Sequence, residues 1–122
     1  MKVAEDKRGP GPIVTAFGPG GFKLGDERHR AVLMTVDAAQ AWSPPALAEL
    51  TVDGLQWLID ARPEFILLGT GATLRRPAPA LTTALAALDI GLEPMASRTA
   101  ARDWGVLRGE GRRIAAALYP LD

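Results

Sequence analysis

Residues 65–71, with the sequence FILLGTG, constrain the fold of this chain more than any other segment. A short apolar run ends abruptly at Gly69, Thr70 and Gly71. Short apolar runs bounded by turn residues are typical of buried strands. Ligands of open α/β sheets bind at the carboxyl ends of the strands. The Gly-Thr-Gly loop therefore predicts where a site would lie, although it does not predict what the site binds.

The chain after position 50 alternates between helical and strand patterns. Apolar residues at helical spacing behind Thr51, a predicted N-cap, indicate a helix that ends before Pro63. Such alternation predicts largely parallel strands joined by right-handed crossovers. The elements expected after this helix are a strand at 65–68, a loop at 69–77, a helix from Pro79, a strand at 92–95, a helix from Ser97 to Gly109 and a strand at 113–118.

The first half of the chain is rich in short β-like runs separated by glycine. Strands are expected at 13–17, 22–24 and 30–36, forming an antiparallel meander joined to the main sheet, and a loop at 37–50. Residues 1–12 are charged and then rich in Gly and Pro, which indicates a flexible N-terminal arm. The prediction is one α/β domain over 13–122, with a mixed central sheet and three main helices.

Charge and composition exclude several classes of function. The 14 basic residues balance 14 acidic ones, whereas nucleic-acid binders usually present a basic surface. Without cysteine and with His29 as the single histidine, a metal site is not expected. No apolar run resembles a secretory signal or reaches the roughly 18 residues that a membrane span needs. We expect a cytoplasmic domain without a cofactor, nucleic-acid partner or membrane insertion.

The Gly-Thr-Gly loop allows two interpretations. Its backbone amides and the following Arg75 and Arg76 could hold an anion such as a phosphate or carboxylate. Alternatively, Gly69 and Gly71 only turn the chain away from a buried strand. The second interpretation is favoured, because no helix begins directly after the glycines, as a phosphate loop or dinucleotide motif requires.

A second group of charged residues surrounds the predicted last helix. Glu93 precedes this helix, and Glu110 and Arg112 follow it. Arg98 and Arg102 share a face of the helix, four residues apart. The group could bind a polar ligand, or it could form an ion-pair network that holds the helix to the sheet. The structural network is favoured.

No catalytic constellation of nucleophile, base and acid can be assembled from the remaining residues. Ser97 is explained as an N-cap, and His29 as a solvated residue in a charged turn. The three tryptophans, Trp42, Trp57 and Trp104, are expected to anchor the core or an interface rather than to stack on bases.

Several motifs in order along the chain resemble those of a known family. These are GTG, a proline-bearing loop and helix, E-x-M-x-S-x-x-A-A-R, V-L-x-x-E-G-R and a final A-A-L-Y-P. The family contains uncharacterised bacterial and archaeal proteins, the mitochondrial complex I assembly factor 3 and the adipogenesis-associated domain protein of animals. The resemblance covers about residues 13–120.

The resemblance implies one α/β domain with a mixed sheet flanked by helices. Where the family commonly has Thr, an aromatic residue and Asn, this chain has Asp103, Trp104 and Gly105, so the amide is missing. The resemblance places the following residues at signature positions of the family: Gly69, Thr70, Gly71, Glu93, Met95, Ala101, Glu110 and Arg112.

Three functional hypotheses follow. The leading one is a non-enzymatic protein-binding or assembly module, because no catalytic constellation is present and the mitochondrial relative binds proteins during complex assembly. Its partner surface would include loop 69–77 and the exposed side of helix 97–108. The alternative is a small-molecule site, with or without enzymatic activity, in which the Gly-Thr-Gly amides and Arg98 or Arg112 hold an anion. The third is a homo-oligomer formed through an apolar patch around Trp42 or Tyr119.

Overall fold

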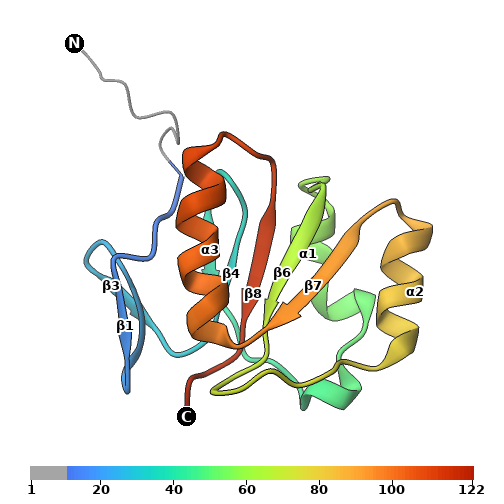
Figure 1. The fold of residues 1–122 in the computed structure, drawn as a ribbon, viewed down its shortest axis with the longest axis horizontal. Coiled ribbons are helices and arrows are strands. Elements are labelled where there is room, and N and C mark those ends of the chain that lie inside the picture. The colour runs from blue at the N-terminus through green and yellow to red at the C-terminus, as the bar shows by residue number, and fades with distance from the viewer. Residues whose placement is uncertain (1–10) are drawn as a thin grey trace.

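A five-stranded sheet forms the centre of the molecule (Figure 1). The computed structural model describes residues 11–122. The strand order is β5-β4-β8-β6-β7, in which β6 pairs in parallel with β7 and β8, and β4 pairs antiparallel with β5 and β8. The predicted mixed α/β fold is confirmed. The strands are β4 (Val32–Met34), β5 (Ala39–Ala41), β6 (Phe65–Gly69), β7 (Gly91–Met95) and β8 (Ala115–Leu118).

A separate three-stranded antiparallel sheet precedes the central one. Its strands are β1 (Ala16–Gly18), β2 (Gly21–Leu24) and β3 (Glu27–His29). The expected meander therefore exists, but the assignment of 30–36 as its third strand was wrong. That run instead contains β4, whose three residues are all buried, so it fits a central strand covered on both faces.

The segment predicted as a loop at 37–50 contains two short elements that sequence patterns did not reveal. β5 is an edge strand of three residues, and η1 (Leu47–Glu49) is a single 3₁₀ turn. The Ala-Gln-Ala sequence of β5 is too short and has no large apolar side chain to give a strand pattern, in keeping with its largely exposed position.

The last two predicted helices are confirmed as α2 (Pro79–Ala87) and α3 (Ser97–Gly109). The helix expected after Thr51 is instead a 3₁₀ segment, η2 (Val52–Leu55), followed by one α-helical turn, α1 (Gln56–Ile59). Gly54 and the β-branched Val52 disfavour a longer α-helix. The Thr51 side chain makes no capping hydrogen bond, so its predicted role was wrong.

No helix within residues 11–122 has the length and apolarity to cross a membrane.

Two apolar cores lie on opposite faces of the central sheet. Ile66 and Leu68 of β6 face the core under α1 and α2, whereas Leu67 faces the core under α3 and the small sheet. Figure 1 shows α3 in front of the sheet and α1 behind it. Trp104 of α3 is fully buried, and its indole N–H donates to the Pro12 carbonyl at 2.9 Å. Residues 1–10 of the predicted N-terminal arm lie outside the described residues.

The central strand β8 consists of three alanines and a leucine, all buried. Because Ala116 packs in the core under α3, we expect Ala116→Leu to lower the free energy of unfolding by about 1–3 kcal/mol through overpacking. Urea unfolding measures this change. Ala86→Leu on the exposed face of α2 adds the same atoms and should change stability by less than about 0.5 kcal/mol. Equal effects of the two variants would contradict the packing argument.

Candidate functional site

The carboxyl ends of the three parallel strands meet at one edge of the central sheet. Gly69 is in register with Met95 of β7 and Leu118 of β8. The Gly-Thr-Gly loop therefore lies beside the start of α3 and the segment that follows β8. This is the carboxyl edge that the sequence predicted as the place of a site.

The two glycines of the loop are required by packing and by backbone conformation. A Cβ on Gly69 would lie 2.7 Å from Ser97 Oγ and 2.9 Å from Leu118 Cδ2. Gly71 has a φ of +110°, which side chains other than hydrogen rarely tolerate. Gly69 thus permits the close approach of β6, α3 and β8, and Gly71 permits the backbone conformation that follows β6.

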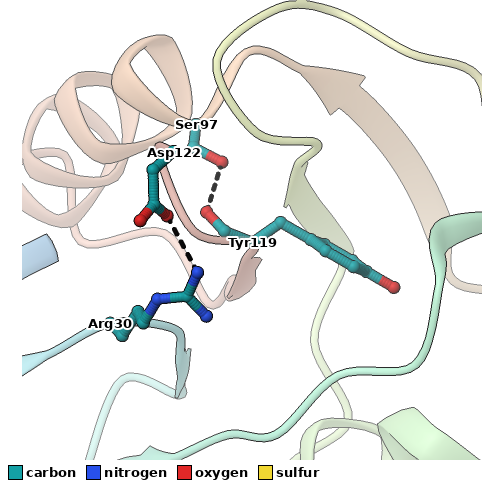
Figure 2. A network of polar contacts seen from close by, with 4 residues as sticks. All are labelled: Arg30, Ser97, Tyr119 and Asp122. Atoms are coloured by element: carbon teal, nitrogen blue, oxygen red, sulfur yellow. Dashed lines mark hydrogen bonds and ion pairs between the residues drawn. The ribbon is translucent and has the colours of Figure 1, made fainter.

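The Ser97 hydroxyl joins the three segments at this edge. It accepts a hydrogen bond from the Gly71 N–H at 2.9 Å and donates one to the Tyr119 carbonyl at 2.9 Å (Figure 2). The Ser97 N–H also donates to the Gly71 carbonyl at 2.8 Å. Ser97 was predicted as an N-cap, but this was wrong, because the N-cap is Ala96 and the buried hydroxyl is used between segments.

Thr70 fixes the loop that follows. Its hydroxyl donates to the Thr73 carbonyl at 2.8 Å and accepts from the Arg75 N–H at 2.9 Å. Its own N–H donates to the Met95 carbonyl at 2.8 Å. The amides of Thr70 and Gly71 are thus both used inside the protein. These two N–H groups are therefore not free to bind an anion, as the anion-binding alternative requires.

The rest of the loop is presented to solvent. Residues 72–76 are all exposed, and Leu74 keeps 54% of its surface accessible. Arg75 and Arg76 follow Leu74 directly. Thr70 thus restrains the backbone of this apolar and basic segment at Thr73 and Arg75.

Arg112, a member of the second predicted group, lies far from the Gly-Thr-Gly loop. Arg112 lies at the opposite edge of the sheet and forms an ion pair with Glu64, with 2.9 Å between Nη2 and Oε1. Its guanidinium also lies over the Phe65 ring, 5.3 Å from the centroid. Sequence patterns did not point to Glu64, which precedes β6 and is 48 residues from Arg112.

The other members of this group lie around α3 without forming one cluster. Glu93 and Arg112 line a shallow pocket of about 450 Å³ on the α3 side of the sheet. Glu110 follows the last turn of α3, and Arg98 is exposed in its first turn, near the carboxyl edge. The Arg102 guanidinium lies 5.5 Å from the Phe17 ring centroid and thus connects α3 to the small sheet.

The Arg112–Glu64 pair shifts the acidity of both groups. The hydrogen bond from Arg112 lowers the pKa of the Glu64 carboxyl, and the same bond raises the pKa of Arg112. The charges of Glu110 and Glu93 add to the second shift. Among residues 11–122, no group of three or more His, Asp or Glu side chains is arranged to hold a metal ion.

Comparison with known proteins assigns the chain to a family. A family model described as "Protein of unknown function (DUF498/DUF598)" matches residues 14–119. The chain belongs to this family. The expected kinship with small uncharacterised bacterial proteins is confirmed, and the DUF498/DUF598 match spans both sheets and all three α-helices.

Similar proteins match most of the length of this DUF498/DUF598 domain. An uncharacterised protein of Rhodobacter capsulatus is 34% identical over 110 residues, covering 88% of this chain and 84% of the relative. A crystal structure of a Bordetella parapertussis protein is 32% identical with a TM-score of 0.80, covering 90% and 96% of the two chains. A solution structure from Bordetella pertussis, described as an Mth938-like domain, is 26% identical with a TM-score of 0.78, covering 99% and 93%.

The Ser97 hydroxyl should be a major source of stability for this DUF498/DUF598 domain. Ser97→Ala leaves the buried Gly71 N–H and Tyr119 carbonyl without a partner, and each such group costs about 1–3 kcal/mol. We expect a loss of roughly 2–4 kcal/mol in the free energy of unfolding, measured by urea titration. Thr99→Ala, on an exposed position of the same helix, should stay within about 0.5 kcal/mol. If Ser97→Ala were as stable as this control, the stabilising role assigned to the Ser97 hydroxyl would be contradicted.

The Arg112–Glu64 pair should stabilise the domain only where Glu64 is ionised. Because the carboxyl pKa is lower in the folded than in the unfolded state, the contribution is present at neutral pH and disappears as the pH falls through the folded-state pKa. NMR titration should show the Glu64 pKa rising toward its ordinary value in Arg112→Gln. In Arg113→Gln, which keeps the Arg112 contact, it should stay low. An unchanged pKa in Arg112→Gln would contradict the assignment.

Proposed function

We propose that this domain is a non-enzymatic, cytoplasmic protein-binding or assembly module. The observation that carries the proposal is the exposed segment 72–76, which presents Leu74 beside two arginines on a loop fixed from within by Thr70. A loop whose backbone is already restrained loses less entropy when a partner binds. Exposed apolar surface next to arginine is a common composition of protein interfaces.

The same edge of the molecule supplies further surface for such a partner. Arg98 is exposed at the start of α3, whose N-terminus is joined to the loop through Ser97 and Gly71. Three arginines are therefore available at one edge of a chain whose net charge is zero. A partner with an acidic patch around an apolar pocket would complement this surface. The resemblance to a mitochondrial assembly factor supports the same class of function by analogy.

The hydroxyl and amide groups of the loop also fit a structural role better than a catalytic one. The Ser97 hydroxyl donates to a backbone carbonyl, and no histidine or carboxylate among residues 11–122 hydrogen-bonds to it.

A homo-oligomer formed around Trp42 or Tyr119 would have little exposed apolar surface at Tyr119. This side chain is 9% exposed and packs edge to face with Trp42, with 4.9 Å between the ring centroids. The large exposed apolar residues of the described chain are Leu74, Leu88 and Val106.

Charge reversal in the loop should abolish partner capture. We expect Arg75→Glu combined with Arg76→Glu to reduce recovery of specific partners from the native host by at least about tenfold, because like charges then face an acidic surface. Affinity pull-down with quantitative mass spectrometry measures this recovery. Leu74→Ser should reduce it as well.

The matched control reverses two other exposed cations, Lys23 and Arg28, which lie opposite each other in the small sheet. This variant has the same net charge as the loop variant and should retain the partners. Thermal unfolding establishes that all variants are folded. Recovery that is unchanged by the loop variant, or equally reduced by the control, would overturn the proposed surface.

A further inference from the structure

A pocket of about 570 Å³ lies at the carboxyl edge, beside the loop that follows Gly71. It lies between segment 42–47, which follows β5, and residues Tyr119 and Pro120, which follow β8. Arg30, before β4, and Arg75, in the loop, complete its lining. Its volume is in the range of about 300–1,000 Å³ that is common for small-molecule sites.

One wall of the pocket is formed by two aromatic side chains that contact each other. The rings of Trp42 and Tyr119 meet edge to face, with 4.9 Å between centroids and 76° between planes. The Tyr119 hydroxyl donates to the Pro45 carbonyl at 2.9 Å, which ties the ring to segment 42–47. Figure 2 shows that the Tyr119 ring extends away from the backbone contact with Ser97. The pocket wall is thus anchored to the same residue that closes the sheet edge.

The polar groups of the pocket favour an anion. Two guanidinium groups line it, and no Asp or Glu is among the lining residues. Burial raises the pKa of the Tyr119 hydroxyl to about 12, further above physiological pH than its ordinary value, so this group adds no negative charge to the pocket. Within residues 11–122, the Arg75 guanidinium and the Trp42 indole N–H make no hydrogen bond or ion pair. Neither group is therefore occupied by another side chain or backbone group of residues 11–122.

The Arg30 guanidinium already forms an ion pair with a carboxylate of the same chain. Its Nη2 lies 3.1 Å from Asp122 Oδ1, in an ion pair whose side chains are largely exposed (Figure 2). Exposed pairs of this kind contribute little stability, typically about 0–1 kcal/mol, so an incoming anion can compete with Asp122. The ion pair with Asp122 shows that the Arg30 guanidinium, which lines the pocket, can donate to a carboxylate.

We propose that this pocket binds a small organic acid with a flat apolar body, whose carboxylate pairs with Arg75 and whose ring lies against Trp42. Arg30 adds positive charge at the rim. The Trp42 indole N–H is a further donor to the carboxylate or to a polar substituent. This site is distinct from the Gly-Thr-Gly amides and from the Glu64–Arg112 pair, and it does not depend on a protein partner.

The test uses the purified protein with 2-naphthoate and its neutral isostere 2-naphthamide, observed by ¹H–¹⁵N NMR at the Trp42 indole. We expect 2-naphthoate to shift this signal with saturation in the millimolar range or below. The amide should bind at least about tenfold more weakly, because it cannot form the charge-assisted contact with arginine. Equal binding of acid and amide, or no shift at Trp42, would overturn the proposal.

Two neighbouring arginines provide a matched pair of variants. Arg75→Gln should weaken 2-naphthoate binding by about tenfold or more, whereas Arg76→Gln, which removes an equal charge outside the pocket lining, should have little effect. Asp122→Asn frees Arg30 and should tighten binding by about two- to fivefold. If both arginine variants lost the same affinity for 2-naphthoate, the effect would come from the overall charge of the protein, and the proposed site would be contradicted.

These outcomes are separate from those of the partner experiment. Leu74→Ser is expected to reduce protein capture but leaves both guanidinium groups and the aromatic walls in place. It should therefore bind 2-naphthoate like the unmodified protein. If a folded Leu74→Ser variant no longer bound 2-naphthoate, the probe would not be bound by the proposed set of pocket-lining residues, which does not include Leu74.

Discussion

The carboxyl edge of the molecule depends on one buried hydroxyl. Ser97 accepts from the Gly71 N–H and donates to the Tyr119 carbonyl, both at 2.9 Å, so β6, α3 and β8 are held at one point. This closeness is possible because Gly69 has no side chain. The exposed loop starts on one side of this contact and the Tyr119 pocket wall on the other. Both candidate binding surfaces thus take their geometry from it.

The second half of the fold was predictable because its signals are local. The run 65–68 is buried on both faces, and α2 and α3 have their apolar residues at helical spacing. The first half was predicted less well, since the choice of sheet for 30–36 depends on Leu118 and its neighbours, far away in sequence. No local pattern distinguishes a third hairpin strand from a strand in the central sheet.

The candidate site shows the same limit. The sequence pointed to Gly69, Thr70 and Gly71 and to the carboxyl edge, because glycines after a buried strand have a local meaning. It did not reveal that Glu64 pairs with Arg112, or that Arg30, Trp42 and Tyr119 line one pocket. These residues are far apart in the sequence and come together only through the strand order β5-β4-β8-β6.

That strand order also has a consequence for synthesis on the ribosome. β8 is the last strand in sequence of residues 11–122, yet it lies between β4 and β6. The β4–β5 hairpin and the β6–β7 pair have no direct pairing with each other, so they stay unjoined until residues 115–118 emerge. Long-range pairing of this kind delays folding and leaves strand edges open. The β4–β5 hairpin and the β6–β7 pair therefore remain two separate parts of the central sheet while residues 96–114 are synthesised.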